Sequence, residues 1–175
     1  GVTDFRTWSE LYYKAYGSNG VIGILFTILT IYRDIVFDQL GFFPFIFLFG
    51  DAGTGKTQFT ENLLRLFGND VIGTSLNNAT TPGLSRTASQ KSNSLVYLKE
   101  YTNETEEAIQ DFILTAYDGA GRTIGLKTTD NRTKTYAVRS GLIFDGNHLP
   151  TQKTAILTRM ILLYFENNTF NTEQT

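Results

Sequence analysis

The chain has 175 residues, of which 41% are hydrophobic and 14% aromatic, so it can bury one sizeable core and we expect a single domain. A net charge of -2 favours neither nucleic acid nor a membrane surface as a whole-chain partner. The chain has no cysteine, and His148 is the only histidine, which excludes a disulfide scaffold and argues against a zinc site made of protein side chains. A reducing cytoplasm fits this composition.

Helical spacing covers residues 4–16 and 19–40, with Gly17 and Gly41 where the helices would end. The most apolar stretch, residues 21–32, is shorter than the roughly 20 residues needed to cross a bilayer. We therefore expect buried helices and no membrane partner. The start of the chain also lacks the basic-then-apolar order of a signal peptide.

Residues 42–49 form a continuous apolar run, which is typical of a strand buried on both faces. The run leads directly into the complete pattern G-x-x-x-x-G-K-[ST], and a predicted helix over 56–67 follows. Backbone N–H groups of such a loop surround phosphate oxygens, and the following helix directs its positive dipole end at the same anion. The predicted nucleotide-binding residues are Gly50, Asp51, Ala52, Gly53, Thr54, Gly55, Lys56, Thr57 and Gln58.

This phosphate loop predicts ATP and Mg²⁺ as the ligands. Lys56 would contact the β- and γ-phosphates, and the Thr57 hydroxyl would bind Mg²⁺. The alternative is a chance glycine-rich turn between a strand and a helix.

Strands and helices alternate through the rest of the chain. We predict strands over 71–76, 95–99, 142–144 and 160–165, a helix over 104–117, and a helix or loop around Pro82. Threonine-rich residues 123–138, with Asp130 and Asn131 in the middle, predict a β-hairpin. This order implies a mainly parallel sheet with both faces covered. The expected organisation is N-terminal helices (1–41) packed on a core (42–166), followed by a polar tail (167–175).

A P-loop ATPase also needs an acidic group at the end of a neighbouring strand, and Glu100 offers one after residues 95–99. Glu100 would orient the attacking water and help to hold the metal. The alternative is that Glu100 only caps the strand.

Here the chain resembles, over about residues 45–165, the helicase domains of phage and mobile-element primase-helicases, which are related to superfamily-three helicases within the AAA+ class. Members of that family usually end this strand with Asp-Glu and then Tyr, whereas this chain has Lys99-Glu100-Tyr101. An ammonium group facing the metal would repel Mg²⁺. Three expectations stay open: Lys99 turns away, Glu100 takes over the missing role, or hydrolysis is slow.

The resemblance implies two more site residues. Asn147, after the strand at 142–144, matches a sensor residue that contacts the γ-phosphate or the attacking water, although Gly-Asn is also ordinary turn chemistry. Arg159 matches an arginine finger that reaches the ATP of the adjacent subunit. It could equally be an ordinary surface arginine, with Arg122 or Arg139 as substitutes.

The predicted hairpin is basic in an acidic chain, because five cationic residues between 122 and 139 face a single acid, Asp130. In superfamily-three helicases, a hairpin at this place lines the pore of the ring and grips single-stranded DNA. The resemblance therefore implies DNA contacts by sequence-independent backbone tracking. The alternative is a hairpin whose charges only keep it soluble. The predicted contact residues are Arg122, Lys127, Arg132 and Lys134.

Together these features predict a three-layer α/β P-loop NTPase of AAA+ type with N-terminal helices and a basic hairpin insertion. The expected function is the ATP-dependent motor of a replicative DNA helicase, assembled as a hexamer in the cytoplasm, or in the host cytoplasm if a phage encodes it. Two alternatives are a P-loop kinase acting on a small acceptor and a nucleotide-binding assembly module that does not hydrolyse ATP.

Overall fold

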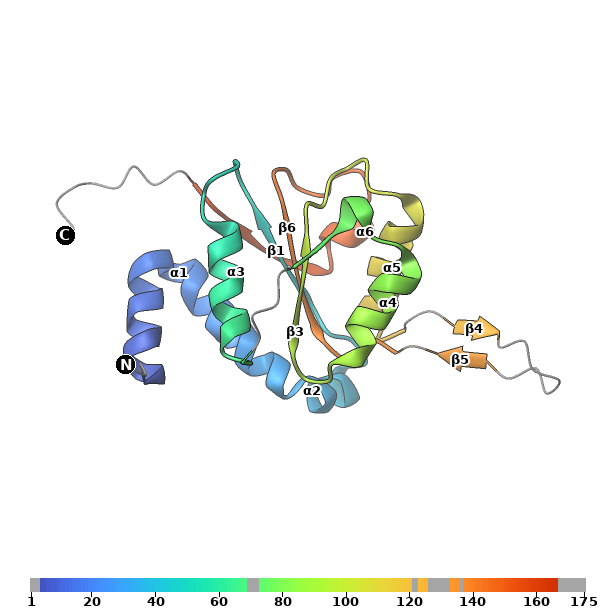
Figure 1. Ribbon diagram of the computed structural model, residues 1–175, viewed down its shortest axis with the longest axis horizontal. Helices are drawn as coiled ribbons and strands as arrows, with labels where there is room; N and C mark the ends of the chain where they lie inside the picture. Colours follow the sequence, from blue (N-terminus) through green and yellow to red (C-terminus); the bar gives the residue numbers. More distant parts are fainter. Residues whose placement is uncertain (1–3, 69–72, 121–122, 126–132, 136, 167–175) are drawn as a thin grey trace.

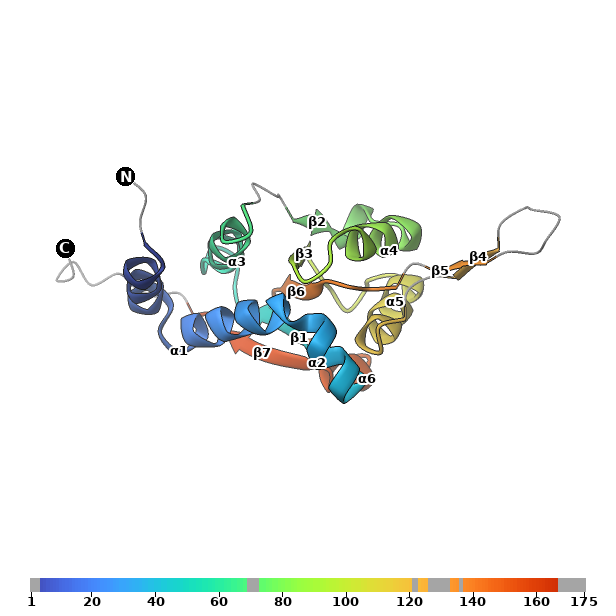
Figure 2. The ribbon, with the colours of Figure 1, turned by 90° about the horizontal axis from the view of Figure 1, so that it is seen from below.

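A computed structural model of the chain describes residues 4–68, 73–120, 123–125, 133–135 and 137–166. Five parallel strands form the central sheet in the order β2-β3-β6-β1-β7 (Figures 1 and 2). The strands are β1 (Phe45–Phe49), β2 (Thr74–Ser75), β3 (Leu95–Lys99), β6 (Gly141–Gly146) and β7 (Met160–Tyr164). The helices are α1 (Phe5–Ile31), α2 (Arg33–Leu40), α3 (Lys56–Arg65), α4 (Thr81–Gln90), α5 (Glu107–Tyr117) and α6 (Thr154–Leu157), with a short 3₁₀ helix at Leu76–Asn78.

The sheet is the middle of three layers, as its continuous apolar strands predicted. In β1, Phe45 and Phe47 pack in one buried cluster with side chains of α4 and α5, while Ile46 and Leu48 pack in the other with α1 and α3. Successive strand residues point to opposite faces, so a strand covered on both sides must be apolar at every position. Figure 2 shows α1 and α3 on one side of the sheet and α4 and α5 on the other.

The N-terminal helices differ from their predicted bounds. Gly17 has non-helical angles (φ 56°, ψ -133°) and breaks α1, as predicted, but the next helical stretch ends at Ile31 instead of Leu40. Tyr32 donates its N–H to Leu29 O at 3.1 Å, an i→i−3 bond that tightens the last turn and separates α1 from α2. Gly41 ends α2 with a left-handed φ of 75°, as its position predicted.

By length and composition alone, α1 is apolar enough to cross a membrane, a test that a core helix of a soluble protein also passes. The break at Gly17 leaves an uninterrupted stretch to Ile31 that is only about 20 Å long at about 1.5 Å per residue. A bilayer core is about 30 Å thick. Phe26 on this stretch is buried in the cluster that also contains Phe59 of α3. These features fit a helix that packs on the sheet layer.

Other elements are shorter than predicted. The strand expected over 71–76 is only Thr74–Ser75, with 71 and 72 outside the described residues, and the strand expected from 42 starts at Phe45. The predicted hairpin is present as β4 (Thr123–Gly125) and β5 (Thr133–Thr135), antiparallel, with Thr123 opposite Thr135. Figures 1 and 2 show it projecting from the end of the molecule beyond α4 and α5.

Candidate functional site

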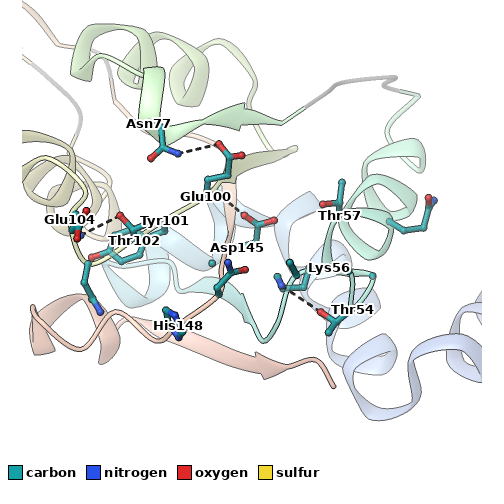
Figure 3. Close-up of a pocket in the computed structure, with 17 residues that line it drawn as sticks. Thr54, Lys56, Thr57, Asn77, Glu100, Tyr101, Thr102, Glu104, Asp145 and His148 are labelled. Carbon is teal, nitrogen blue, oxygen red and sulfur yellow. Dashed lines mark hydrogen bonds between the residues drawn. The ribbon is translucent and has the colours of Figure 1, made fainter. Parts of the chain in front are cut away.

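A cavity of about 1010 Å³ opens where the carboxyl ends of β1, β3 and β6 meet (Figure 3). Ligand sites in parallel α/β sheets form at this edge. The cavity brings together Lys56, Thr57, Glu100 and Asn147, four of the predicted site residues. Its lining consists of residues 52–58, Asn77, residues 100–104 and residues 145–148.

The loop between β1 and α3 has the backbone of a phosphate cradle. Three of its residues have positive φ angles, Gly50 at 138°, Gly53 at 84° and Gly55 at 89°. A Cβ on Gly50 would also collide with the carbonyl oxygen of Phe165, so only glycine fits there. No side chain caps the N-terminus of α3, so its first N–H groups are available to an anion.

Lys56 extends along the inside of this loop. Its Nζ donates to Gly50 O at 2.6 Å and to Asp51 O at 2.8 Å. Burial lowers the pKa of Lys56, while the negative charges of Asp145 and Asp51 oppose that shift. The ammonium group of Lys56 therefore lies at the edge of the phosphate loop. Phosphate oxygens would compete there with two main-chain carbonyls for its hydrogen bonds.

Glu100 follows β3 in a left-handed conformation, with φ of 63°, which is uncommon for a residue with a side chain. Its Oε2 accepts hydrogen bonds from Ser75 Oγ and, at 3.4 Å, from Asn77 Nδ2. Figure 3 shows Glu100 between Asn77 and the phosphate loop. Glu100 thus lines the cavity, as predicted. Its carboxylate accepts hydrogen bonds from Ser75 in β2 and from Asn77, which follows β2.

Lys99 does not line the cavity. Its Nζ lies 5.3 Å from the centre of the Tyr97 ring, a cation–π contact on the face of β3 that also carries Tyr97. The Lys99 ammonium therefore contacts the Tyr97 ring, and the choice among the three expectations for Lys99 stays a prediction.

Asp145 lies at the centre of the site, and the sequence analysis missed it. Only 8% of the residue is exposed. Its Oδ1 accepts the Glu100 N–H at 2.7 Å, its other carboxylate oxygen accepts the Tyr97 hydroxyl, and its main-chain oxygen accepts the Tyr101 N–H at 2.8 Å. The strand β6 was expected to stop at Phe144, which placed Asp145 in a loop. A charged residue at the end of an otherwise apolar buried strand was the signal available.

Asn147 is exposed, follows β6 and lines the cavity together with His148. Arg159 lies elsewhere. It precedes β7, at the amino end of the sheet, whereas the phosphate loop follows the carboxyl end of the neighbouring β1. Its Nη1 donates to Ala155 O at 2.6 Å and its guanidinium lies 5.2 Å from the centre of the Tyr117 ring.

Most of the predicted DNA contacts cannot be placed. Arg122, Lys127 and Arg132 lie outside the described residues, and Lys134 lies in β5 opposite Ile124. Arg139, one of the substitutes for the arginine finger, is exposed shortly before β6.

Within the part of the chain that the structure describes, no group of three His, Cys, Asp or Glu residues could hold a metal ion by itself. Mg²⁺ in a phosphate-loop site needs no such group, because it takes phosphate oxygens, waters and a single hydroxyl. The Thr57 hydroxyl and the nearby carboxylates are oxygen donors of the kind that this ion prefers. The residues present therefore fit nucleotide-bound Mg²⁺.

The strand order, the glycine loop between β1 and α3 and the acidic residues on the adjacent strands define a three-layer P-loop NTPase fold of AAA+ type. Two solved structures share it. One is SCCmec type IV Cch, described as an active helicase, with a TM-score of 0.63 and 17% identity over 93% of this chain and 31% of that one. The other is a mutant of RuvB from Thermotoga maritima, with a TM-score of 0.54 and 11% identity over 90% of this chain and 46% of that one.

The chain thus spans less than half of either structure. No protein-family model and no curated protein matches it. At these identities the likeness shows the fold.

Proposed function

We propose that this chain is the ATPase motor of a replicative DNA helicase, which couples ATP hydrolysis to translocation along single-stranded DNA. The observation that carries the proposal is the convergence of Lys56, Thr57, Glu100 and Asn147 on one cavity at the carboxyl edge of a parallel sheet. An SCCmec type IV protein of the same fold is described as an active helicase, which favours the proposal.

Each residue has a role that its position allows. Lys56 and the N–H groups at the start of α3 bind the β- and γ-phosphates, and Thr57 binds the Mg²⁺ that neutralises charge on those phosphates. Glu100 accepts a proton from the attacking water, and the Asn147 amide orients that water or the γ-phosphate. Both lie at strand ends that face the phosphate loop.

Assembly is part of the proposal. Arg159 is at the opposite end of the sheet from its own phosphate loop, so it would serve the ATP of a neighbouring subunit in a cytoplasmic hexamer. The hairpin of β4 and β5 projects from the molecule, as a segment that reaches DNA in a pore would. Lys127, Arg132 and Lys134 would then contact the phosphate backbone.

The contacts of Glu100 and Lys99 favour a second candidate, a nucleotide-binding module that assembles without hydrolysis. Ser75 and Asn77 both donate to one oxygen of the Glu100 carboxylate, and Lys99 stands where the family that the chain resembles has an acid. A P-loop kinase is the remaining alternative, and a phosphorylated small acceptor would reveal it.

The test is ATP hydrolysis with and without single-stranded DNA, together with the mass of the protein in ATP. We expect DNA to stimulate hydrolysis and ATP to produce a hexamer mass. The variant with Lys127, Arg132 and Lys134 all replaced by alanine should keep its basal rate and lose the stimulation, because it lacks cations that meet the DNA backbone.

The control variant carries the same change in charge on other elements, with alanine at Lys14, Arg65 and Lys91. Unchanged stimulation in the hairpin variant would remove the DNA-tracking role. Bound ATP that stays intact over long incubation would favour the assembly module.

A further inference from the structure

At the end of β3, Lys99 occupies the position before Glu100, where the family that the chain resembles carries an aspartate. Three carboxylates line the cavity, those of Glu100, Glu104 and Asp145. One oxygen of Glu100 accepts hydrogen bonds from Ser75 and Asn77 on the β2 side. The charge of Asp145, together with that of Asp51, raises the pKa of Lys56, where the phosphates would bind.

The protein fixes the direction of the Asp145 carboxylate. One oxygen accepts the Glu100 N–H at 2.7 Å and the other accepts the Tyr97 hydroxyl. Glu100 also has a left-handed backbone, so the chain leaves the direction of β3 immediately after this N–H. Such a conformation is strained and persists only where surrounding contacts hold it.

Asp145 lines the same cavity as Thr57, whose hydroxyl would bind the metal. Figure 3 shows Asp145 between Glu100 and Lys56. Burial raises the pKa of Tyr97, which donates to Asp145, and the charge of Asp145 raises it further.

This arrangement suits a water-mediated metal contact. Mg²⁺ dehydrates reluctantly and keeps several waters. A carboxylate has about four acceptor positions, and two at Asp145 are occupied by Tyr97 and Glu100. The others can accept hydrogen bonds from metal-bound water.

We propose that Asp145, at the end of β6, replaces the missing acid of β3 and holds the water shell of Mg²⁺ bound to ATP at Thr57. The proposal rests on the nucleotide binding proposed above. It explains how the chain accommodates Lys99, whose ammonium lies on the Tyr97 ring outside the cavity.

The decisive experiment measures ATP binding, with a fluorescent ATP analogue, as the Mg²⁺ concentration is raised. A second measurement follows binding of Mn²⁺–ATP by electron paramagnetic resonance. Asp145→Asn keeps the size of the side chain and removes its charge. We expect the Mg²⁺ concentration for half-maximal enhancement of ATP binding to rise about 10-fold or more, the usual effect of losing an outer-shell ligand. ATP affinity in EDTA should stay within about threefold of wild type, because Lys56 and the loop are intact.

One control variant separates the role of Asp145 from the loss of any negative charge in the cavity. Glu104→Gln removes another acid of the same cavity. It should keep the wild-type Mg²⁺ dependence.

If a folded Asp145→Asn variant requires the same Mg²⁺ concentration as wild type, the Asp145 proposal is overturned. Loss of ATP binding in Lys56→Ala at the same time would still support the nucleotide site. Absence of ATP binding by the wild-type protein overturns both. Thermal melting checks that each variant is folded. If Asp145→Asn does not fold, Asp145→Ser, whose hydroxyl can accept from Glu100 N–H, is titrated in its place with the same expected and overturning results.

Discussion

Lys56 is subject to two opposing effects in the phosphate loop. Burial lowers the pKa of its ammonium, and the charges of Asp145 and Asp51 raise it. The ammonium donates to the carbonyls of Gly50 and Asp51, so its position is fixed before any phosphate binds. A preorganised cation of this kind loses little freedom when an anion arrives, which is the condition for tight binding.

We therefore expect Lys56→Ala to weaken binding of Mg²⁺–ATP by about 10- to 100-fold, the range for loss of about 1.5–3 kcal/mol from a hydrogen bond to a charged group. Isothermal titration with a slowly hydrolysed ATP analogue measures this. Lys14→Ala is the matched control, since Lys14 is an exposed lysine of α1. Wild-type affinity in Lys56→Ala would contradict the assignment of the loop.

Among the site residues, those that lie in one continuous motif or directly after a predicted strand could be found from the sequence. Residues 50–57 could be assigned because the motif carries its own geometry, and Glu100 because it follows an apolar run. Asp145 could not, because its place in the cavity depends on β6 lying between β1 and β3 in the sheet. The orientation of Lys99 was also out of reach, because it depends on the neighbouring Tyr97 ring.

Among the elements, α1 contributes to the core through a close contact with α3. A Cβ on Gly23 would lie 2.6 Å from Phe59 Cζ and 3.2 Å from Leu63 Cδ1. Phe59 and Leu63 are fully buried, so neither side chain can move aside into solvent. Gly23 thus allows the backbone of α1 to approach α3 closely.

Gly23→Ala should lower the free energy of unfolding by about 1–3 kcal/mol, the usual cost of overpacking, less a gain of up to about 1 kcal/mol in helix propensity. Urea denaturation measures the change. Gly83→Ala is the control, because Gly83 is exposed in α4 and a new Cβ would meet only Thr80 Oγ1, at 3.3 Å; the change in stability should stay below about 1 kcal/mol. Equal effects of both substitutions would contradict the close approach of α1 to α3 at Gly23.

Hydrophobic patterns predicted the elements better than their ends. The apolar run of β1 and the stripe of α5 fix type and burial locally, and both are present. The break at Tyr32 was missed because the residues around it keep a helical spacing. Buried contacts favour it instead, since Arg33 at the start of α2 lies over the rings of Phe37 and Phe43.

In the whole molecule, the carboxyl edge and the amino edge of the parallel sheet carry different residues. The cavity lies at the carboxyl edge, and Arg159 precedes β7 at the amino edge. The strand β7 pairs with β1 along the whole length of β1, from Phe45 to Phe49. A strand of this length spans about 13 Å or more at about 3.3 Å per residue. Arg159 is therefore remote from the phosphate loop of its own chain, so the finger role proposed for it requires a neighbouring subunit.

Mixing two inactive variants tests that role directly. Lys56→Ala subunits lack a working ATP site but carry Arg159, and Arg159→Ala subunits carry the site but lack the finger. Each variant alone should hydrolyse ATP about 1,000-fold more slowly than wild type or worse, if the arginine stabilises the transition state in a neighbour. In an equal mixture, about a quarter of the interfaces in a head-to-tail ring combine an intact site with an intact finger, so activity should return.

The contacts of Arg159 within its own subunit supply the competing explanation. Its guanidinium lies over Tyr117 and donates to Ala155 O, so Arg159→Ala could slow hydrolysis by loosening α6. A loosened subunit is not repaired by a Lys56→Ala neighbour, and the mixture would then stay inactive. Tyr117→Leu, which removes the ring but keeps the arginine, should hydrolyse ATP without mixing if the finger acts between subunits. Two results together are expected only for a finger that acts between subunits. The mixture of Lys56→Ala and Arg159→Ala recovers activity, and Tyr117→Leu is active by itself.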